Sequence, residues 1–140
     1  MDANKKLFVD ADAFVALNYL DDSSHNKAVV LSQEVKDLNI SLITSDPAFG
    51  EAVTVISQRG GLDLAVAFAE DILGGEIEII EVDSSLRRRA LDIFKKQTSK
   101  NSRFTDCVNM AIMKERGLNT IFSFDIQYKK NKFKRFGIDK

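Results

Sequence analysis

Short runs of apolar and β-branched residues alternate along the chain with longer segments in which apolar residues recur at helical spacing. Polar residues bound each short run, which is typical of strands buried on both faces. These runs are residues 7–9, 40–43, 77–82 and 120–124, and a weaker fifth run covers 133–138. The alternation predicts an α/β fold of three layers, with a central, mostly parallel sheet of four or five strands flanked by helices.

The segments between these runs each carry one apolar face. Ala28, Leu31 and Val35 form the first apolar stripe, and similar stripes begin at residues 49, 65, 86 and 104. Ser45 followed by Pro47 predicts a helix cap and first turn, and the glycine pairs at 60–61 and 74–75 predict helix ends. Because ligands of parallel α/β sheets bind beyond the carboxyl ends of the strands, residues that follow strands are the candidates for a site.

Length and composition fit one domain over residues 1–140. The chain has 140 residues and one cysteine, which is long enough to bury a core without disulfides. It has no amino-terminal apolar stretch of signal-peptide type and no apolar run long enough to span a membrane. We therefore expect a soluble, cytoplasmic protein without a membrane partner.

Charge is divided unevenly along the chain. Residues 1–83 hold 5 Lys and Arg against 16 Asp and Glu, a net charge of −11, whereas residues 84–140 hold 15 against 5, a net charge of +10. Such asymmetry indicates a polyanionic partner, although in a compact domain the two halves interleave and the surface is then more even.

Four acidic residues are expected at one edge of the sheet. Asp10 directly follows the first strand and Asp125 the fourth, so a parallel sheet places both at the same edge. Glu51 lies one turn into the helix that Pro47 opens, and Asp106 lies in the first turn of another helix. At about 100° per residue these two stand roughly 200° from the aromatic residue of their apolar stripe, outside the core. A solvated helix face is the alternative to a shared site.

Converging carboxylates need a compensating charge. Two like charges about 4 Å apart repel by on the order of 4 kcal/mol at an effective dielectric near 20. Either some of these acids have a raised pKa, or a divalent cation is bound. Ligands that are all oxygen, without a His or Cys cluster, favour Mg²⁺ or Mn²⁺ over zinc.

Other candidate chemistry finds little support in the sequence. His25 fits an exposed helix start better than a catalytic role, and Cys107 lies on an apolar stripe and is expected in the core. The chain contains no GxGxxG or Walker-type loop, so a nucleotide cofactor is not indicated.

The sequence resembles the PIN domain, and within that family the VapC-type ribonuclease toxins. The resemblance covers nearly the whole chain, through LFVDADAFVAL, LITSDPAFGEAVTVI, RFTDCVNMAIMKERG and TIFSFD. Asp10, Glu51, Asp106 and Asp125 match the four acidic positions of the family, and Ser123 matches a small hydroxyl position that accompanies the last acid. The resemblance implies an endoribonuclease whose four carboxylates are catalytic and hold Mg²⁺ or Mn²⁺, and whose products carry a 5′-phosphate and a 3′-hydroxyl.

One departure from the family pattern lies beside the first acid. The family commonly has Thr and then Ser or Asn there, whereas this chain has Ala11 and Asp12. The missing hydroxyl removes one hydrogen bond that the site could otherwise make. Asp12 either adds a fifth carboxylate or caps its helix.

The basic half of the chain supplies candidates for RNA binding, because phosphate contacts give sequence-independent affinity. These candidates are Lys95, Lys96, Lys100, Arg103, Lys129 and Lys130. The alternative for each is an ordinary solubilising side chain. Phe133 and Phe136 either stack on bases or pack in the last strand.

The resemblance also implies partners. A VapC-type toxin of a type II toxin–antitoxin pair is expected to bind a small antitoxin protein and often forms a homodimer. Residues 62–73 are unusually apolar, so they line a dimer face or pack on the sheet.

Two alternatives for the function remain. A haloacid-dehalogenase-like phosphatase would use Asp10 as nucleophile and Thr44 or Ser45 as its hydroxyl motif, but it also needs a late acidic pair, and Asp125 stands alone. The other alternative is a PIN-domain RNA-processing nuclease, or a binding scaffold, without an antitoxin.

Overall fold

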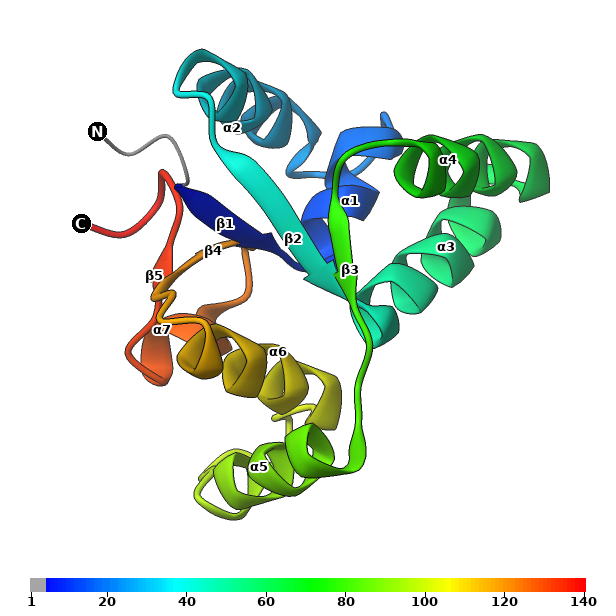
Figure 1. Ribbon diagram of the computed structural model, residues 1–140. Helices are drawn as coiled ribbons and strands as arrows, with labels where there is room; N and C mark the ends of the chain where they lie inside the picture. The colour runs from blue at the N-terminus through cyan, green and yellow to red at the C-terminus, as the bar shows by residue number, and fades with distance from the viewer. Residues whose placement is uncertain (1–4) are drawn as a thin grey trace.

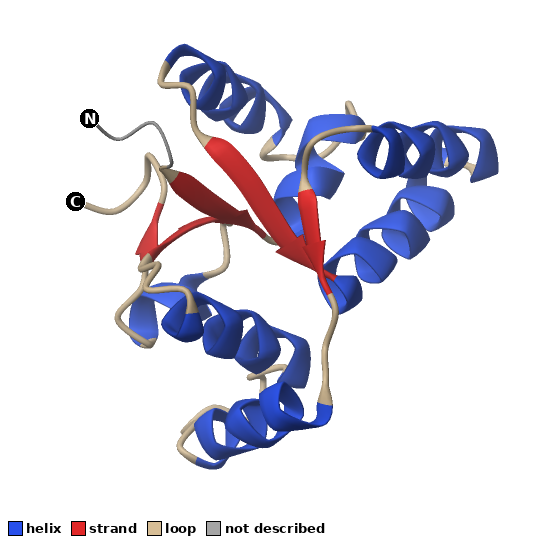
Figure 2. Ribbon diagram, in the orientation of Figure 1, coloured by secondary structure: helices blue, strands red, loops and turns tan. Residues whose placement is uncertain are grey.

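Five parallel strands form one sheet in the computed structural model, which describes residues 5–140. The strands are β1 (Lys6–Val9), β2 (Ser41–Ser45), β3 (Glu78–Ile80), β4 (Thr120–Phe122) and β5 (Lys134–Arg135). Their order across the sheet is β3-β2-β1-β4-β5, and each neighbouring pair is parallel (Figure 2). The predicted α/β class is confirmed, with a sheet that is wholly parallel.

Helices cover both faces of this sheet, as Figure 1 shows. Helices on one side pack into a core with β1 and β4, and those on the other side pack into a second core. The first group is α1 (Ala11–Asn18), α2 (His25–Asp37), α3 (Asp46–Gly60) and α4 (Leu62–Gly74). The second group is α5 (Ser84–Lys95), α6 (Phe104–Glu115) and α7 (Ile126–Lys130).

The central strand β1 is buried on both faces. Leu7 and Val9 point into the core beneath α1 and α2, whereas Phe8 points into the core beneath α6. Full burial of such a side chain stabilises the fold by roughly 1.5–3 kcal/mol. This two-sided burial explains why β1 reads as a continuous apolar run rather than an alternating one.

The element boundaries follow the local signals closely. The Oγ of Ser45 accepts a hydrogen bond from Ala48 N at 3.2 Å and caps α3, and α3 ends at Gly60. The predicted runs at 77–82 and 133–138 form the two edge strands, β3 and β5, which are only 3 and 2 residues long. Over residues 5–140 no helix has the length and apolar character needed to cross a bilayer.

The end of the chain approaches α2 closely at Gly137, and an alanine substitution there tests this packing. Gly137 and Gly117 have nearly equal positive φ values of 70° and 68°, but only at Gly137 would a Cβ overlap the buried side chain of Leu31. Gly117→Ala should therefore lower the free energy of unfolding by about 1 kcal/mol, the cost of a left-handed non-glycine residue. Gly137→Ala should lose a further 1–3 kcal/mol, roughly, through overpacking. Urea denaturation measures both, and equal losses would contradict this packing.

Candidate active site

Asp10 joins the end of the central strand to the start of α1. Its backbone N–H donates to Phe122 O at 3.1 Å, which continues the pairing of β1 with β4. Its Oδ1 accepts from Ala11 N at 2.8 Å and caps α1, and also accepts from the side-chain amide of Asn109 at 3.2 Å. Ser123 Oγ donates to Oδ2 at 3.3 Å. The carboxylate is therefore fixed by both the backbone and side chains from two other elements.

A buried polar network connects Asp10 with Asp106. Ser45 Oγ donates to Asn109 Oδ1 at 2.7 Å, and Asn109 Nδ2 donates to the Tyr128 hydroxyl at 3.0 Å. That hydroxyl donates in turn to Asp106 Oδ1 at 3.2 Å. The sequence patterns did not predict a role for Asn109 or Tyr128. Asn109 could have been found, because it is a polar residue one turn after Asp106 in a mostly apolar helix.

Asp106 corrects one expectation. Both Asp10 and Asp106 are only 6% exposed, so Asp106 does not lie on a solvated helix face. Its burial follows from the contact with Tyr128, which is itself fully buried beside the first turns of α6. Glu51 is half-buried at 37% side-chain exposure and lies 3.7 Å from Arg103 Nη1. The helical angle therefore predicted correctly that Glu51 lies outside the core. The same prediction was wrong for Asp106, which is buried.

Asp125 and Asp12 meet in the loop after β4. Asp125 caps α7, since its Oδ1 accepts from Gln127 N at 2.9 Å. Asp12 Oδ2 accepts from Phe124 N at 2.8 Å and lies 3.2 Å from Ser123 Oγ, whose single proton it shares with Asp10 Oδ2. Asp12 therefore orients the loop that carries Asp125, and the cap of α1 is Asp10 instead.

Burial and neighbouring carboxylates raise the pKa values of Asp10, Asp12 and Asp106. Burial first, and then the charge of Asp12, raise the pKa of Asp10 to about 7, and Glu51 adds to this effect. Burial and the charges of Asp10 and Asp125 raise the pKa of Asp106 to about 7. Burial is also the main reason that the pKa of Asp12 is raised to about 6, with Asp125 adding to it. All five carboxylates therefore belong to one electrostatic site.

The donor set fits a hard divalent cation. Asp12 Oδ1 and Asp106 Oδ2 are buried and have no hydrogen-bond partner within residues 5–140. Such uncompensated carboxylate oxygens are the ligands that Mg²⁺ and similar ions take. In the described part of the chain, no three Asp, Glu, His or Cys side chains already form a ligand group. The two unpartnered oxygens of Asp12 and Asp106 are thus available as ligands.

The predicted RNA-binding side chains differ in their partners. Arg103 precedes α6 and pairs with Glu51, and Lys129 lies 3.8 Å from Asp139. The remaining four are exposed, namely Lys95, Lys96, Lys100 and Lys130. Phe133 is 6% exposed, so it packs in the core and cannot stack on bases, and Phe136 packs against Phe122 at a ring separation of 6.4 Å.

Two further sequence expectations concern His25 and Cys107. His25 begins α2, as predicted, but it is half-buried, and its Nδ1 donates to Ala16 O at 2.7 Å. Cys107 is buried in the core as predicted, and burial raises the pKa of its thiol to about 11. Neither side chain is placed for nucleophilic catalysis.

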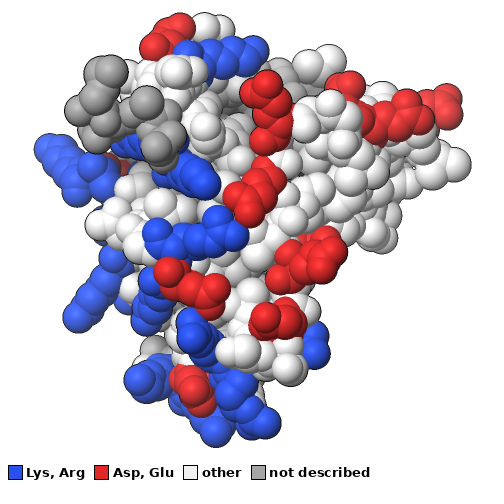
Figure 3. Space-filling view, viewed as in Figure 1, with Lys and Arg blue, Asp and Glu red and all other residues white. Residues whose placement is uncertain are grey.

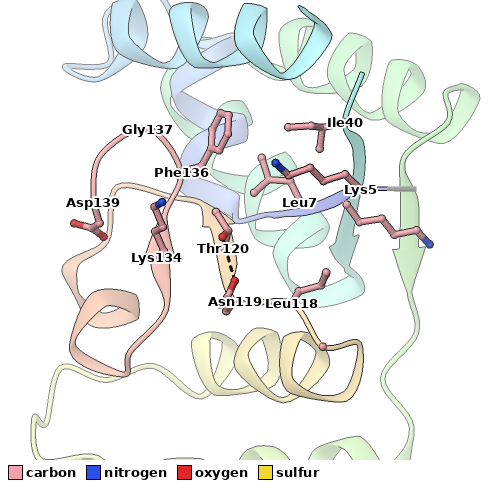
Figure 4. Close-up of a pocket in the computed structure, with 12 residues that line it drawn as sticks. Lys5, Leu7, Ile40, Leu118, Asn119, Thr120, Lys134, Phe136, Gly137 and Asp139 are labelled. Atoms are coloured by element: carbon pink, nitrogen blue, oxygen red, sulfur yellow. Dashed lines mark hydrogen bonds between the residues drawn. The ribbon is translucent and has the colours of Figure 1, made fainter. Parts of the chain in front are cut away.

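A cavity of about 510 Å³ lies at the opposite edge of the sheet, where the strands begin (Figure 4). Lys5, Thr120 and Lys134 line it together with Phe136. None of the five carboxylates borders this cavity, so it is separate from the candidate active site.

Comparison with known proteins agrees with the geometry. The sequence model of the PIN domain matches residues 7–134. The chain belongs to the PIN-domain family. It is also 26% identical over 119 residues to proteins of two Mycobacterium tuberculosis strains named "23S rRNA-specific endonuclease VapC20", an alignment that covers 85% of this chain and 88% of theirs.

A solved structure shares the fold of this PIN domain. The crystal structure of Mycobacterium tuberculosis VapC20, described as a sarcin-ricin loop cleaving toxin, superposes with a TM-score of 0.80 at 23% identity. The match covers 91% of this chain and 95% of that one. The resemblance to the VapC group of PIN domains is therefore confirmed in sequence and in fold.

Asp12 should stabilise this PIN domain through the loop after β4. Asp12→Ala leaves the partly buried N–H of Phe124 without its acceptor, so we expect a loss of about 1–3 kcal/mol in the free energy of unfolding. Asp12→Asn keeps an oxygen that can accept this bond, and should lose much less. Denaturation in the presence of EDTA compares the two, and equal losses would contradict a role for this hydrogen bond.

The PIN domain without metal should lose stability as pH rises. Asp10 and Asp106 have raised pKa values in the folded state, so the folded protein retains protons that the unfolded chain releases above about pH 4. The free energy of unfolding should therefore fall between pH 5 and pH 8, by on the order of a few kcal/mol. Asp10→Asn should flatten this dependence, and the exposed Asp92→Asn should not. Denaturation in EDTA at pH 5 and pH 8 measures the free energy of unfolding. A free energy of unfolding that rises with pH would contradict the burial of these charges.

Proposed function

We propose that this PIN domain is a divalent-metal-dependent endoribonuclease and the toxin of a type II toxin–antitoxin pair. The observation that carries the proposal is the buried pair Asp10 and Asp106, joined by Asn109 and Tyr128 at the carboxyl edge of the sheet. The names of the VapC20 relatives, which act on 23S rRNA, support RNA as the substrate class. Family membership also removes the ground for a haloacid-dehalogenase-like phosphatase.

We infer that Asp10, Glu51, Asp106 and Asp125 are the catalytic residues and hold Mg²⁺ or Mn²⁺. The unpartnered Oδ2 of Asp106 and the oxygen-only donor set support this assignment, and the unpartnered Oδ1 of Asp12 is an auxiliary ligand candidate. A divalent cation in such a site makes water a stronger nucleophile and stabilises charge on the attacked phosphate and the leaving oxygen.

The other residues of the network position these carboxylates. Asn109 and Ser123 donate to Asp10, and the Tyr128 hydroxyl donates to Asp106, so these two side chains keep their orientation before substrate arrives. Ser123 Oγ also accepts from Asp125 N at 3.1 Å and so fixes the start of α7. The expected products carry a 5′-phosphate and a 3′-hydroxyl.

Basic side chains around the acidic edge are proposed to hold the RNA backbone. Figure 3 shows that most Lys and Arg of the visible face lie on the side of α5 and β5, whereas Asp and Glu are concentrated over α4 and β3. The charge division of the sequence thus persists on this face. Arg103 pairs with Glu51, and the other proposed RNA-binding side chains are exposed, namely Lys95, Lys96, Lys100, Lys129 and Lys130.

The same proposal includes protein partners. A small antitoxin would block the nuclease, and a homodimer would use exposed apolar side chains. On α4, Ala65 and Phe68 pack in the core, while Leu62, Val66 and Leu73 are exposed and line a groove with α3. Packing on the sheet therefore accounts for Ala65 and Phe68, and the exposed side chains of Leu62, Val66 and Leu73 are the ones we propose for a dimer face.

Cleavage of RNA by the purified protein tests the proposed function. With Mg²⁺ or Mn²⁺ the wild type should cut a mixed-structure RNA, and EDTA should abolish cutting. Asp10→Asn and Asp106→Asn should each lower the rate by about 10²-fold or more, because each removes a charged ligand. Asp92→Asn, an exposed acid of α5, should leave the rate unchanged.

Two outcomes would contradict the proposal. Cutting that persists in EDTA, or in both active-site variants, would exclude this carboxylate site as the nuclease. Hydrolysis of a phosphomonoester without cleavage of RNA would favour the phosphatase alternative. Gel analysis of end-labelled RNA and a chromogenic phosphatase substrate give the two readouts.

A further inference from the structure

A second cavity extends sideways from the carboxylates. It has a volume of about 450 Å³, within the usual range for small-ligand sites. Asp12, Glu51 and Arg103 line the end next to the candidate active site, and Asp22 and Arg59 line it from the α1–α2 loop and α3. We call this space the side cavity. Nothing in the proposed function so far uses its distal residues.

The distal wall of the side cavity is held in place. Asp22 Oδ1 accepts from Ser24 N at 2.8 Å, and Asp22 N donates to Tyr19 O at 3.1 Å. The Asp22 Oδ2 then accepts from Arg59 Nη1 at 3.4 Å. His25 fastens the same loop to the end of α1 through Ala16 O. The α1–α2 loop therefore fixes the carboxylate of Asp22, and this carboxylate pairs with Arg59.

Arg59 keeps most of its hydrogen-bonding capacity. Among the described residues only its Nη1 donates, and it donates to Asp22 alone, while its side chain is 53% exposed. A guanidinium has five N–H donors in a planar fork. The guanidinium of Arg59 therefore has unused N–H donors for a ligand in the side cavity.

A nucleobase suits the side cavity better than a phosphate does. Three carboxylates, those of Asp12, Asp22 and Glu51, border the space and would repel a phosphate. Val15, Val55 and Phe124 give it apolar walls suited to a flat, neutral ring. Of the four bases, guanine has two adjacent acceptors, O6 and N7, that match an arginine fork.

We propose that the side cavity binds a guanine next to the scissile phosphate, with Arg59 as the residue that selects it. The inference rests on the proposed ribonuclease function and adds a specificity site to it. Asp22 acts through Arg59 and is a positioning residue. Arg103, at the mouth of the side cavity, would contact the phosphate between the bound base and the carboxylates.

Sequencing the ends released from a randomised RNA tests the selection. The wild type should cut bonds with guanine at one flanking position about tenfold or more over other bases, the discrimination expected of one bidentate contact. Arg59→Gln should lose this preference with an unchanged melting temperature, because an exposed ion pair contributes little stability. Arg88→Gln, an exposed arginine of α5, should affect all sequences alike.

Nucleoside binding gives a readout that does not depend on cleavage. In saturation-transfer NMR the wild type should bind guanosine in preference to adenosine, cytidine and uridine, and Arg59→Gln should not. Selection of another base, or the same selection in Arg59→Gln, would overturn the specificity site. Failure of the wild type to cut any RNA would overturn the proposed function instead, and guanosine binding would then still decide whether the side cavity accepts this base.

Discussion

The structure depends on burying like charges at the end of its central strand. Asp10 continues the backbone pairing of β1 with β4, so its carboxylate cannot move away from the sheet edge. Burying an ionised carboxylate is costly unless hydrogen bonds or an opposite charge compensate it. Asn109, Ser123 and the N–H of Ala11 supply the hydrogen bonds. Asp12 and Asp106 each have only one oxygen that accepts hydrogen bonds within residues 5–140, and their other buried oxygen still needs an opposite charge or a donor.

The polar network around Asp10 and Asp106 is built from distant parts of the chain. Its members come from the ends of β1 and β2, from α6 and from α7, which a parallel sheet brings to one edge. Ser45 ends β2, caps α3 and orients Asn109, so one hydroxyl couples helix geometry to the site. Because each buried polar group is another's partner, the loss of one leaves the next unsatisfied. These hydrogen bonds therefore fix the orientation of Asp10 and Asp106 at the carboxyl edge of the sheet.

The sequence predicted the fold well because each level of the pattern agreed with the others. The apolar runs located the strands, the Ser45 cap and the paired glycines located helix ends, and carboxylates that follow parallel strands were expected at one edge. The burial of Asp106 could not be predicted from helical angle alone, because the covering group is Tyr128, which follows Asp106 by 22 residues. Asp12 was undecided for the same reason, since its partners Ser123 and Phe124 lie more than 100 residues away.

An acidic site that acts on a polyanion must resolve an electrostatic conflict. The carboxylates that attract a cation also repel the RNA backbone, and the repulsion is strongest where the backbone must come closest. We propose that the RNA backbone approaches beside Arg103, which lies three residues before Asp106 and 3.7 Å from Glu51. Arg103 is 69% exposed, so its pairing with Glu51 is weak and a phosphate can replace it as partner. Acidic and basic halves of the sequence thus meet at the start of α6, where Arg103 pairs with Glu51.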